Sequence, residues 1–291
     1  MSLTGNYVVQ IPKQLNMYTA EGLFYPRFGN NGFRPIIFDF SAVNFITPEA
    51  MIILVISSQH LNKLTGQTIH WRVPKRDIRA YLERMNINKL PFVHLEIPFQ
   101  LVSRVRQHSD SLIELSHIST PLEIGRAIKE TRDILSLWFP NNANHVQQNL
   151  STLIKETVEN SIDHSGTSPD SGNCYYALQK YSHSDGTTEI QIAVGDNGIG
   201  ILNSQKTRFP ETKDDADAIY EALINGRTCR SNGNGGMGFM NVRSALSPLN
   251  GVLTIRSGRG CIIYNSSALH PKIYRQLPDL PGTQVLFMCR A

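Results

Sequence analysis

The pattern of apolar and polar residues in the first hundred positions alternates strand-like and helix-like segments. Thr47 is typical of a helix N-cap, Pro48 suits the first helical position, and Glu49 places an acid in the first turn. The alternation favours a small α/β domain, a sheet covered by helices. In chain order, the pattern predicts a strand at 35–40, a helix from 47 to about 64, a strand at 68–73 and a helix at 77–85.

From Ser119 onward the pattern changes to two long helices followed by strands. It predicts an α+β layer in which helices cover one side of a mixed sheet. We place the domain boundary near 105–118, which gives a first domain at 1–110 and a second at 111–291. The second half is expected to contain helices at 121–139, 143–163, 215–224 and 239–246, and strands at 174–181, 188–194, 252–255, 261–264 and 283–288.

The helix expected at 143–163 carries an apolar stripe on one side and a polar stripe on the other. Glu156, Asn160 and Asp163 stand at i, i+4 and i+7, so they share the polar stripe. A solvated helix face gives the same pattern. The segments that follow favour a functional site instead.

The strand expected at 188–194 leads directly into an aspartate and two glycines. By the period of two, Asp196 continues the apolar face of this strand, where a carboxylate is costly unless it is hydrogen-bonded. Gly198 and Gly200 allow close approach of the backbone to a ligand. Alone, this segment is also typical of an ordinary turn.

A glycine-rich turn precedes the helix expected at 239–246. Such a turn presents backbone N–H groups and the positive end of the helix dipole to an anion. No Gly-Lys-Ser/Thr occurs there, which excludes a Walker loop, and no strand immediately precedes it, which excludes a Rossmann turn. The glycines are Gly233, Gly235, Gly236 and Gly238.

These three segments together resemble the N, G1 and G2 boxes of the GHKL ATPases, the superfamily of gyrase-type, Hsp90-type, MutL-type and histidine-kinase ATP-binding domains. The resemblance covers about residues 118–291, and Gly282-Thr283 is similar to a family position that reaches the nucleotide. The GMGF form is most similar to the bacterial anti-sigma-factor serine kinases. The matching motifs are ExxxN at 156–160, DxGxG at 196–200 and GGMGF at 235–239.

The resemblance implies an ATP site with a magnesium ion. Asp196 would accept a hydrogen bond from the adenine amino group, and Asn160 would hold the Mg²⁺ that bridges the phosphates. Glu156 would be the catalytic base that polarises a water or a protein hydroxyl for attack on the γ-phosphoryl group.

The remaining nucleotide contacts are also implied by the resemblance. Gly235, Gly236 and Gly238 would hold phosphate oxygens, Gly198 and Gly200 would line the nucleotide, and Thr283 would reach it. A lid is expected at 203–234, with Arg227 or Arg230 as phosphate contacts. Asp163 would position Asn160 or a water.

The stretch IIFDFSAVNFITPEAMIILV is similar to the central strand, turn and helix of STAS domains, over about residues 30–95. Phosphorylatable STAS domains carry a serine at the start of that helix, but this chain has Thr47-Pro48-Glu49. We therefore interpret Thr47 as an N-cap, and the first domain as a module for regulation or docking. A generic α/β module is the alternative.

Four functions are compatible with the motifs to different degrees. A serine/threonine kinase acting on a separate regulatory protein is favoured. An ATP-hydrolysing or ATP-gated switch is the alternative, because Glu156 serves hydrolysis equally well. A histidine kinase is disfavoured, since only 43 positions separate His117 from Asn160; we interpret His117 as a helix-boundary residue. A degenerate scaffold is disfavoured by the intact Glu156, Asn160 and Asp196.

The composition of the chain also bears on the kinds of partner, the location and the metals to expect. The net charge of +4 is mild and no basic run is dense, which argues against nucleic acid. The longest apolar run, around 51–56, is too short to span a bilayer, and no leader opens the chain, so we expect a cytoplasmic protein. Four dispersed cysteines and nine scattered histidines predict no structural metal. A homodimer is left open.

Overall fold

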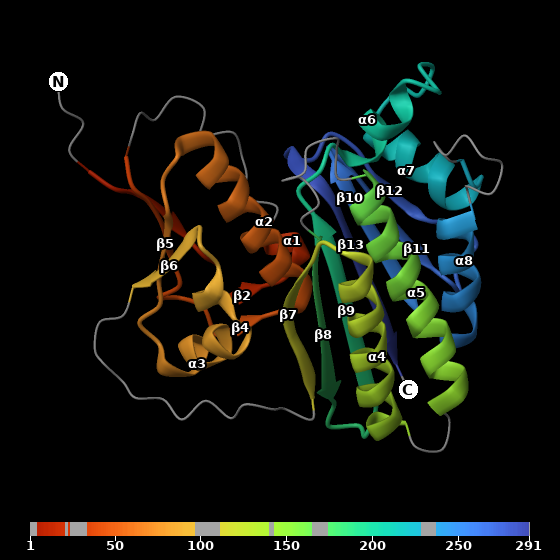
Figure 1. Ribbon diagram of the computed structural model, residues 1–291, viewed down its shortest axis with the longest axis horizontal. Coiled ribbons are helices and arrows are strands. Elements are labelled where there is room, and N and C mark those ends of the chain that lie inside the picture. The colour runs from red at the N-terminus through yellow and green to blue at the C-terminus, as the bar shows by residue number, and fades with distance from the viewer. Residues whose placement is uncertain are drawn as a thin grey trace. The chain divides into compact units, whose positions relative to one another are not determined.

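The computed structural model describes residues 5–20, 23, 34–96, 111–139, 143–164, 174–227 and 237–290. The chain divides into two compact units, residues 1–109 and 110–291, which Figure 1 shows in red to yellow and in yellow to blue. Within the described ranges, no helix combines the length and the apolar character needed to cross a bilayer.

The first unit is built on a parallel sheet with the strand order β1-β3-β5-β6, and it also contains a parallel pair, β2-β4. The strands and helices predicted between residues 35 and 85 are confirmed, whereas β1 and β6 were not predicted. The elements are β1 (Tyr7–Gln10), β2 (Gln14–Leu15), α1 (Met17–Ala20), β3 (Ile36–Asp39), β4 (Phe45–Ile46), α2 (Pro48–Thr65), β5 (Ile69–Arg72), α3 (Arg76–Arg84), the 3₁₀ turn η2 (Ile87–Lys89) and β6 (Val93–Glu96).

Helix α2 begins and ends where the sequence pattern predicts. Thr47 is extended at the N-cap, and Gly66 ends the helix in the left-handed region with φ 67°. The Thr47 hydroxyl does not cap the helix, however. It donates to the carbonyl of Leu15 at 3.3 Å, and Thr47 is 6% exposed. The hydroxyl therefore joins the start of α2 to strand β2.

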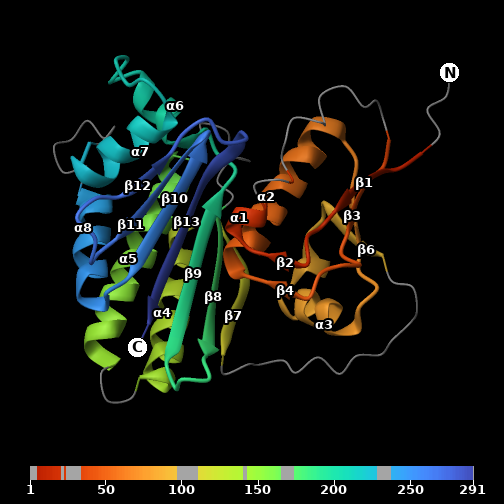
Figure 2. The same ribbon diagram turned by 180° about the vertical axis from the view of Figure 1, so that it is seen from behind.

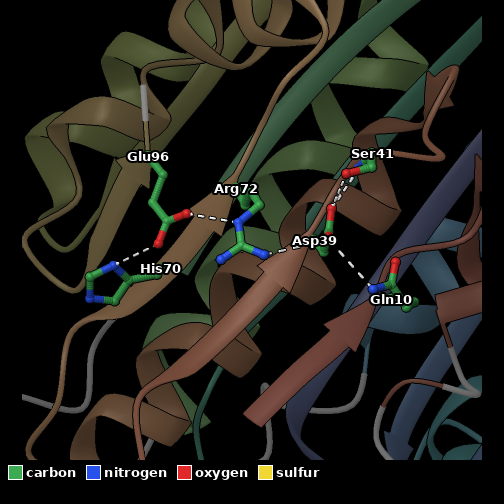
Figure 3. Close-up of polar contacts among 6 residues, drawn as sticks. All are labelled: Gln10, Asp39, Ser41, His70, Arg72 and Glu96. Carbon is green, nitrogen blue, oxygen red and sulfur yellow. Dashed lines mark hydrogen bonds and ion pairs between the residues drawn. The ribbon is translucent and has the colours of Figure 1, made fainter. Parts of the chain in front are cut away.

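The two faces of the parallel sheet differ in chemistry. Phe38 and Trp71 lie on the apolar face, where the Trp71 indole donates to Ser58 of α2 at 3.1 Å. The opposite face carries a polar row at the carboxyl ends of the strands, in which Arg72 donates to Glu96 at 3.0 Å. Its members pair with one another, as Figure 3 shows: Gln10, Asp39, Ser41, His70, Arg72 and Glu96.

The second unit is a seven-stranded sheet with the order β12-β11-β10-β13-β9-β8-β7. Helices α4, α5 and α8 lie side by side on one face of this sheet, as the two opposite views in Figures 1 and 2 show. The elements are β7 (Leu112–Ile118), α4 (Pro121–Trp138), α5 (Ala143–His164), β8 (Cys174–Ser182), β9 (Thr188–Asp196), α6 (Gly200–Lys206), α7 (Asp215–Ile224), α8 (Met237–Leu246), the 3₁₀ turn η3 (Ser247–Leu249), β10 (Val252–Gly258), β11 (Gly260–Asn265), β12 (Lys272–Tyr274) and β13 (Leu280–Arg290).

Two expectations about this unit were wrong. The sheet is not mixed, because every pairing among its described strands is antiparallel. The β8–β9 and β10–β11 connections are short turns, and such turns join antiparallel neighbours. His117 is not a helix-boundary residue. It lies in β7 opposite Tyr175 of β8, with ring centroids 5.4 Å apart.

The core of this unit lies between the sheet and its helices. The apolar stripe of α5 packs there as predicted, with Leu153, Ile154 and Val158 fully buried. Helix α7 contributes Ile219 and Leu223 to the same core, both at 0% exposure. Burial of such side chains is the main favourable contribution to the stability of the unit.

A capping box fixes the start of α4. The Thr120 hydroxyl accepts from the Glu123 backbone N–H, and the Glu123 carboxylate accepts from the backbone N–H groups of Ser119 and Thr120 at 2.8 and 2.9 Å. The bond from the Ser119 N–H is the largest cause that lowers the pKa of Glu123 to about 2. Both ends of the box are therefore satisfied at pH 7.

Thr120→Ala should destabilise the second unit by about 1 kcal/mol, because it removes the hydroxyl that caps α4. Thr152→Ala is the matched control, since the Thr152 hydroxyl only donates to the Gln148 carbonyl within α5. Urea denaturation followed by circular dichroism measures both. Equal free energies of unfolding for the two variants would contradict the role of the cap.

Candidate functional site

The first turn of α8 packs against two polar side chains of α5. A Cβ placed on Gly238 would lie 3.2 Å from Oε2 of Glu156 and 3.1 Å from Nδ2 of Asn160. Both side chains are half-buried. Because α8 covers this part of the polar stripe, Glu156 and Asn160 do not form a merely solvated helix face, and only a glycine fits opposite them without displacement.

A second residue of α8 contacts the same carboxylate. The Asn241 amide donates from Nδ2 to Oε1 of Glu156 at 2.9 Å. The two oxygens of Glu156 therefore have different surroundings, with Asn241 at one and the Gly238 turn at the other. The sequence pattern did not indicate this contact.

Asp196 lies at the end of β9 with 4% exposure and has the partners that a buried carboxylate requires. Its Oδ1 accepts from the backbone N–H of Gly198 at 2.8 Å and from that of Thr283 at 3.2 Å. Burial raises the pKa of Asp196 to about 7, although these bonds and one from Ser161 oppose the shift.

Ser161 of α5 connects the two parts of the site. Its side chain hydrogen-bonds the Asp196 carboxylate and the Cys174 thiol, and it directly follows Asn160 in the helix. One helix therefore carries Glu156 and Asn160 toward α8 and, through Ser161, holds the aspartate at the end of β9.

Ser257 of β10 holds the glycine loop that follows Asp196. Its hydroxyl donates to the Gly282 carbonyl at 3.0 Å and accepts from the Ile201 N–H at 3.0 Å. It also lies 3.2 Å from the Thr283 hydroxyl. Gly200 needs to be glycine here, because its φ is 77° and a Cβ would lie 3.0 Å from the Ser257 oxygen.

The other expected site residues differ in exposure and contacts. Asp163 is exposed in the last turn of α5. Arg227 forms ion pairs with Glu221 and Glu211 at 3.2 and 3.6 Å, and its guanidinium lies 4.5 Å from the centroid of the Phe209 ring. Gly233, Gly235, Gly236 and Arg230 lie outside the described residues.

The described part of the expected lid, 203–227, contains the predicted helix and part of a second one. It contains the end of α6 and all of α7, and α7 packs into the core. The N-terminus of α7 is held by Arg275, which pairs with Asp214 and with Asp217, the latter at 2.6 Å. Core packing and these ion pairs thus hold α7 against the second unit.

The side chains present fit a magnesium ion that is held mainly by phosphates. Mg²⁺ prefers oxygen ligands and in nucleotide sites takes one or two from the protein. Asn160 offers one amide oxygen. No cluster of three or more His, Cys, Asp or Glu side chains suited to a metal occurs among the described residues.

The second unit is thus a layered α+β domain with a buried aspartate at the end of β9, and with Glu156 and Asn160 beside a glycine at the start of a facing helix. Residues 145–270 match the family of histidine kinase-, DNA gyrase B- and HSP90-like ATPases. These residues carry a GHKL-type domain, which supports ATP binding. No curated protein matches the chain.

The sequence analysis did not identify three residues of the site. For two of them, the sequence pattern did contain an indication. Ser161 is a polar residue in the apolar stripe of α5, three positions after Val158. Ser257 continues the buried face of β10 after Leu253 and Ile255, as Asp196 does in β9. A polar residue on a buried face was thus the indication for both serines. No pattern in the sequence indicated Asn241.

Gly282→Ala should disrupt the site through the Asp196 backbone. Gly282 has φ 73°, and a Cβ there would overlap the Asp196 carbonyl. We expect the usual cost of about 1–2 kcal/mol for a positive φ and about 1–3 kcal/mol more for overpacking. Gly186→Ala is the control, because it has φ 83° with open space around it. Denaturation midpoints measure both; equal losses would contradict the close approach.

The pKa of Asp196 predicts a stability difference that depends on pH. Between about pH 4 and pH 7 the folded state keeps the proton that the unfolded state has released, so the free energy of unfolding falls as pH rises through this window. Asp196→Asn should remove that part of the slope. Urea unfolding at several pH values measures it, and parallel curves for the two proteins would contradict the raised pKa.

Proposed function

We propose that this protein is a magnesium-dependent, ATP-binding regulatory protein that phosphorylates a serine or threonine of a separate partner, as anti-sigma-factor serine kinases do. One observation supports the proposal: Glu156 and Asn160 lie together against Gly238 in the first turn of α8. On the same helix, Ser161 holds the buried Asp196.

Recognition of adenine would depend on Asp196. A buried carboxylate at the end of β9 offers a strong acceptor to the exocyclic amino group of adenine, since hydrogen bonds to charged groups are about twice as strong as neutral ones. The bonds from Gly198 and Thr283 fix its orientation before ligand arrives, so little ordering is needed on binding.

The phosphates would lie at the N-terminus of α8. A helix start attracts anions through its free N–H groups and its dipole. Gly238, with Gly235 and Gly236 before it, would hold phosphate oxygens. Asn160 would supply one oxygen to a Mg²⁺ that neutralises the phosphate charge and orients the γ-phosphoryl group.

Glu156 would be the general base. Its carboxylate lies beside Asn160 and next to the glycine turn, where the γ-phosphoryl group and an attacking hydroxyl would meet. It would accept the proton of that hydroxyl as the new bond to phosphorus forms. An ATP-hydrolysing switch uses the same base on a water, and this remains the second candidate.

The phosphoacceptor would belong to a partner protein. Thr47, the hydroxyl residue in the STAS-like position, is 6% exposed and donates to Leu15, so it is poorly placed to receive a phosphoryl group. The first unit, which we propose to be STAS-like, would bind or regulate rather than accept phosphate. We place this activity in the cytoplasm, and we leave open whether two copies associate.

Incubation with γ-labelled ATP and Mg²⁺, with and without cell extract, separates the two candidates. A kinase transfers label to a protein serine or threonine, whereas a switch releases free phosphate only. Glu156→Gln should still bind nucleotide and should lose either activity, by about 100-fold or more. Undiminished turnover in this isosteric variant would remove Glu156 as the base, and absence of both products in the wild type would contradict the proposal.

A further inference from the structure

We propose that Asn241 is a positioning residue that fixes Glu156 so that Oε2, and not Oε1, takes the proton from the attacking hydroxyl. The inference rests on the proposed role of Glu156 as the base. It assigns a function to an α8 residue that none of the family motifs contains.

The contacts of the two carboxylate oxygens support the assignment. Oε1 accepts the Asn241 Nδ2–H at 2.9 Å, so one of its lone pairs is engaged. Oε2 faces the point where a Cβ of Gly238 would stand, 3.2 Å away, and the Asn160 amide is 3.1 Å from the same point. Because position 238 has no side chain, Gly238 packs close to Oε2 without displacing it, and no hydrogen bond to Oε2 occurs among the described residues, so its lone pairs can accept a proton.

The chemistry of an asparagine suits this role. A neutral amide donor restrains the rotation of the carboxylate, and a rigidly held base loses less entropy in reaching the reactive geometry. An arginine or lysine in its place would bring a positive charge against the carboxylate and hold it in an ion pair. Asn241 therefore orients Glu156 without adding a charge to the site.

The proton and the electrons balance in the proposed step. The hydroxyl oxygen forms a bond to the γ-phosphorus, the bond between that phosphorus and the β–γ bridging oxygen breaks, and ADP leaves with the electron pair. The hydroxyl proton moves to Oε2 of Glu156 and is released later to solvent. Asn241 keeps its hydrogen bond to Oε1 throughout.

Gly238 and Asn241 both place α8 against the carboxylate of Glu156. Gly238 and Asn241 are separated by three positions, so they share a face of α8, and that face meets Glu156. Both oxygens of Glu156 therefore depend on the same face of α8 for their surroundings.

Asn241→Ala tests the inference in the full chain. We expect ATP affinity, measured by calorimetry, to change less than about 3-fold, and kcat to fall by about 10- to 100-fold. The matched control is Asn62→Ala, because Asn62 of α2 also donates from Nδ2, to the Gln67 carbonyl at 2.9 Å, in the first unit. Its kcat should be unchanged.

A double-mutant cycle separates positioning from a structural role. In the Glu156→Gln background, Asn241→Ala should cause no further fall in kcat, because the base it positions is already gone. An additive fall, or an unchanged kcat in the single variant, would overturn the inference while leaving Glu156 as the base. Should Asn241→Ala fold poorly by circular dichroism, Asn241→Leu keeps the volume and removes the donor, and the same cycle applies.

The outcome also distinguishes this inference from the proposed function. Full turnover in Glu156→Gln, or absence of turnover in the wild type, would overturn the base assignment and with it the role of Asn241. A large loss in Glu156→Gln together with no loss in Asn241→Ala overturns the role of Asn241 alone.

Discussion

The burial of one carboxylate, that of Asp196, is the constraint on which the rest of the site depends. A charged group in a protein core is tolerated only where donors surround it. Three separate segments supply them: the turn after β9 through Gly198, the start of β13 through Thr283, and α5 through Ser161. The hydrogen-bonding needs of Asp196 therefore add a polar contact between α5 and the end of β9 to the apolar packing of α5 in the core.

The placement of α5 in turn determines the catalytic side of the site. Once Ser161 is held, Asn160 and Glu156 project from the neighbouring turns toward α8, where Gly238 allows the two helices to approach. The burial of Asp196 has a cost. Because it raises the pKa of this carboxylate to about 7, it lowers the free energy of unfolding at neutral pH. A ligand that hydrogen-bonds this carboxylate would recover part of that cost.

Much of the fold and the main residues of the site could be predicted from sequence, because they depend on local patterns. The period of α5 places Glu156 and Asn160 on one stripe, and the period of β9 places Asp196 on a buried face. Strand pairing could be read in the same way only for the two hairpins, β8–β9 and β10–β11. The rest of the strand order and the strand identity of His117 depend on partners far apart in the chain.

The hydrogen-bonding residues that complete the site show the same limit. Asn241 contacts Glu156 across 85 positions of sequence, and Ser257 contacts Gly282 across 25. No local pattern specifies such contacts, which arise only when α8 packs on α5 and β10 pairs with β13. The ion pairs of Arg227 with Glu221 and Glu211 are further contacts that the sequence pattern did not indicate.

The most direct test of this account is a calorimetric titration of the full chain with ATP and Mg²⁺, using wild type, Asp196→Asn and Asp185→Asn. Asp185 is a matched aspartate, because its carboxylate accepts a hydrogen bond from the Thr187 backbone N–H in the exposed β8–β9 turn. The account predicts that wild type and Asp185→Asn bind ATP equally, and that Asp196→Asn, although folded, does not. Tight ATP binding by Asp196→Asn would contradict it.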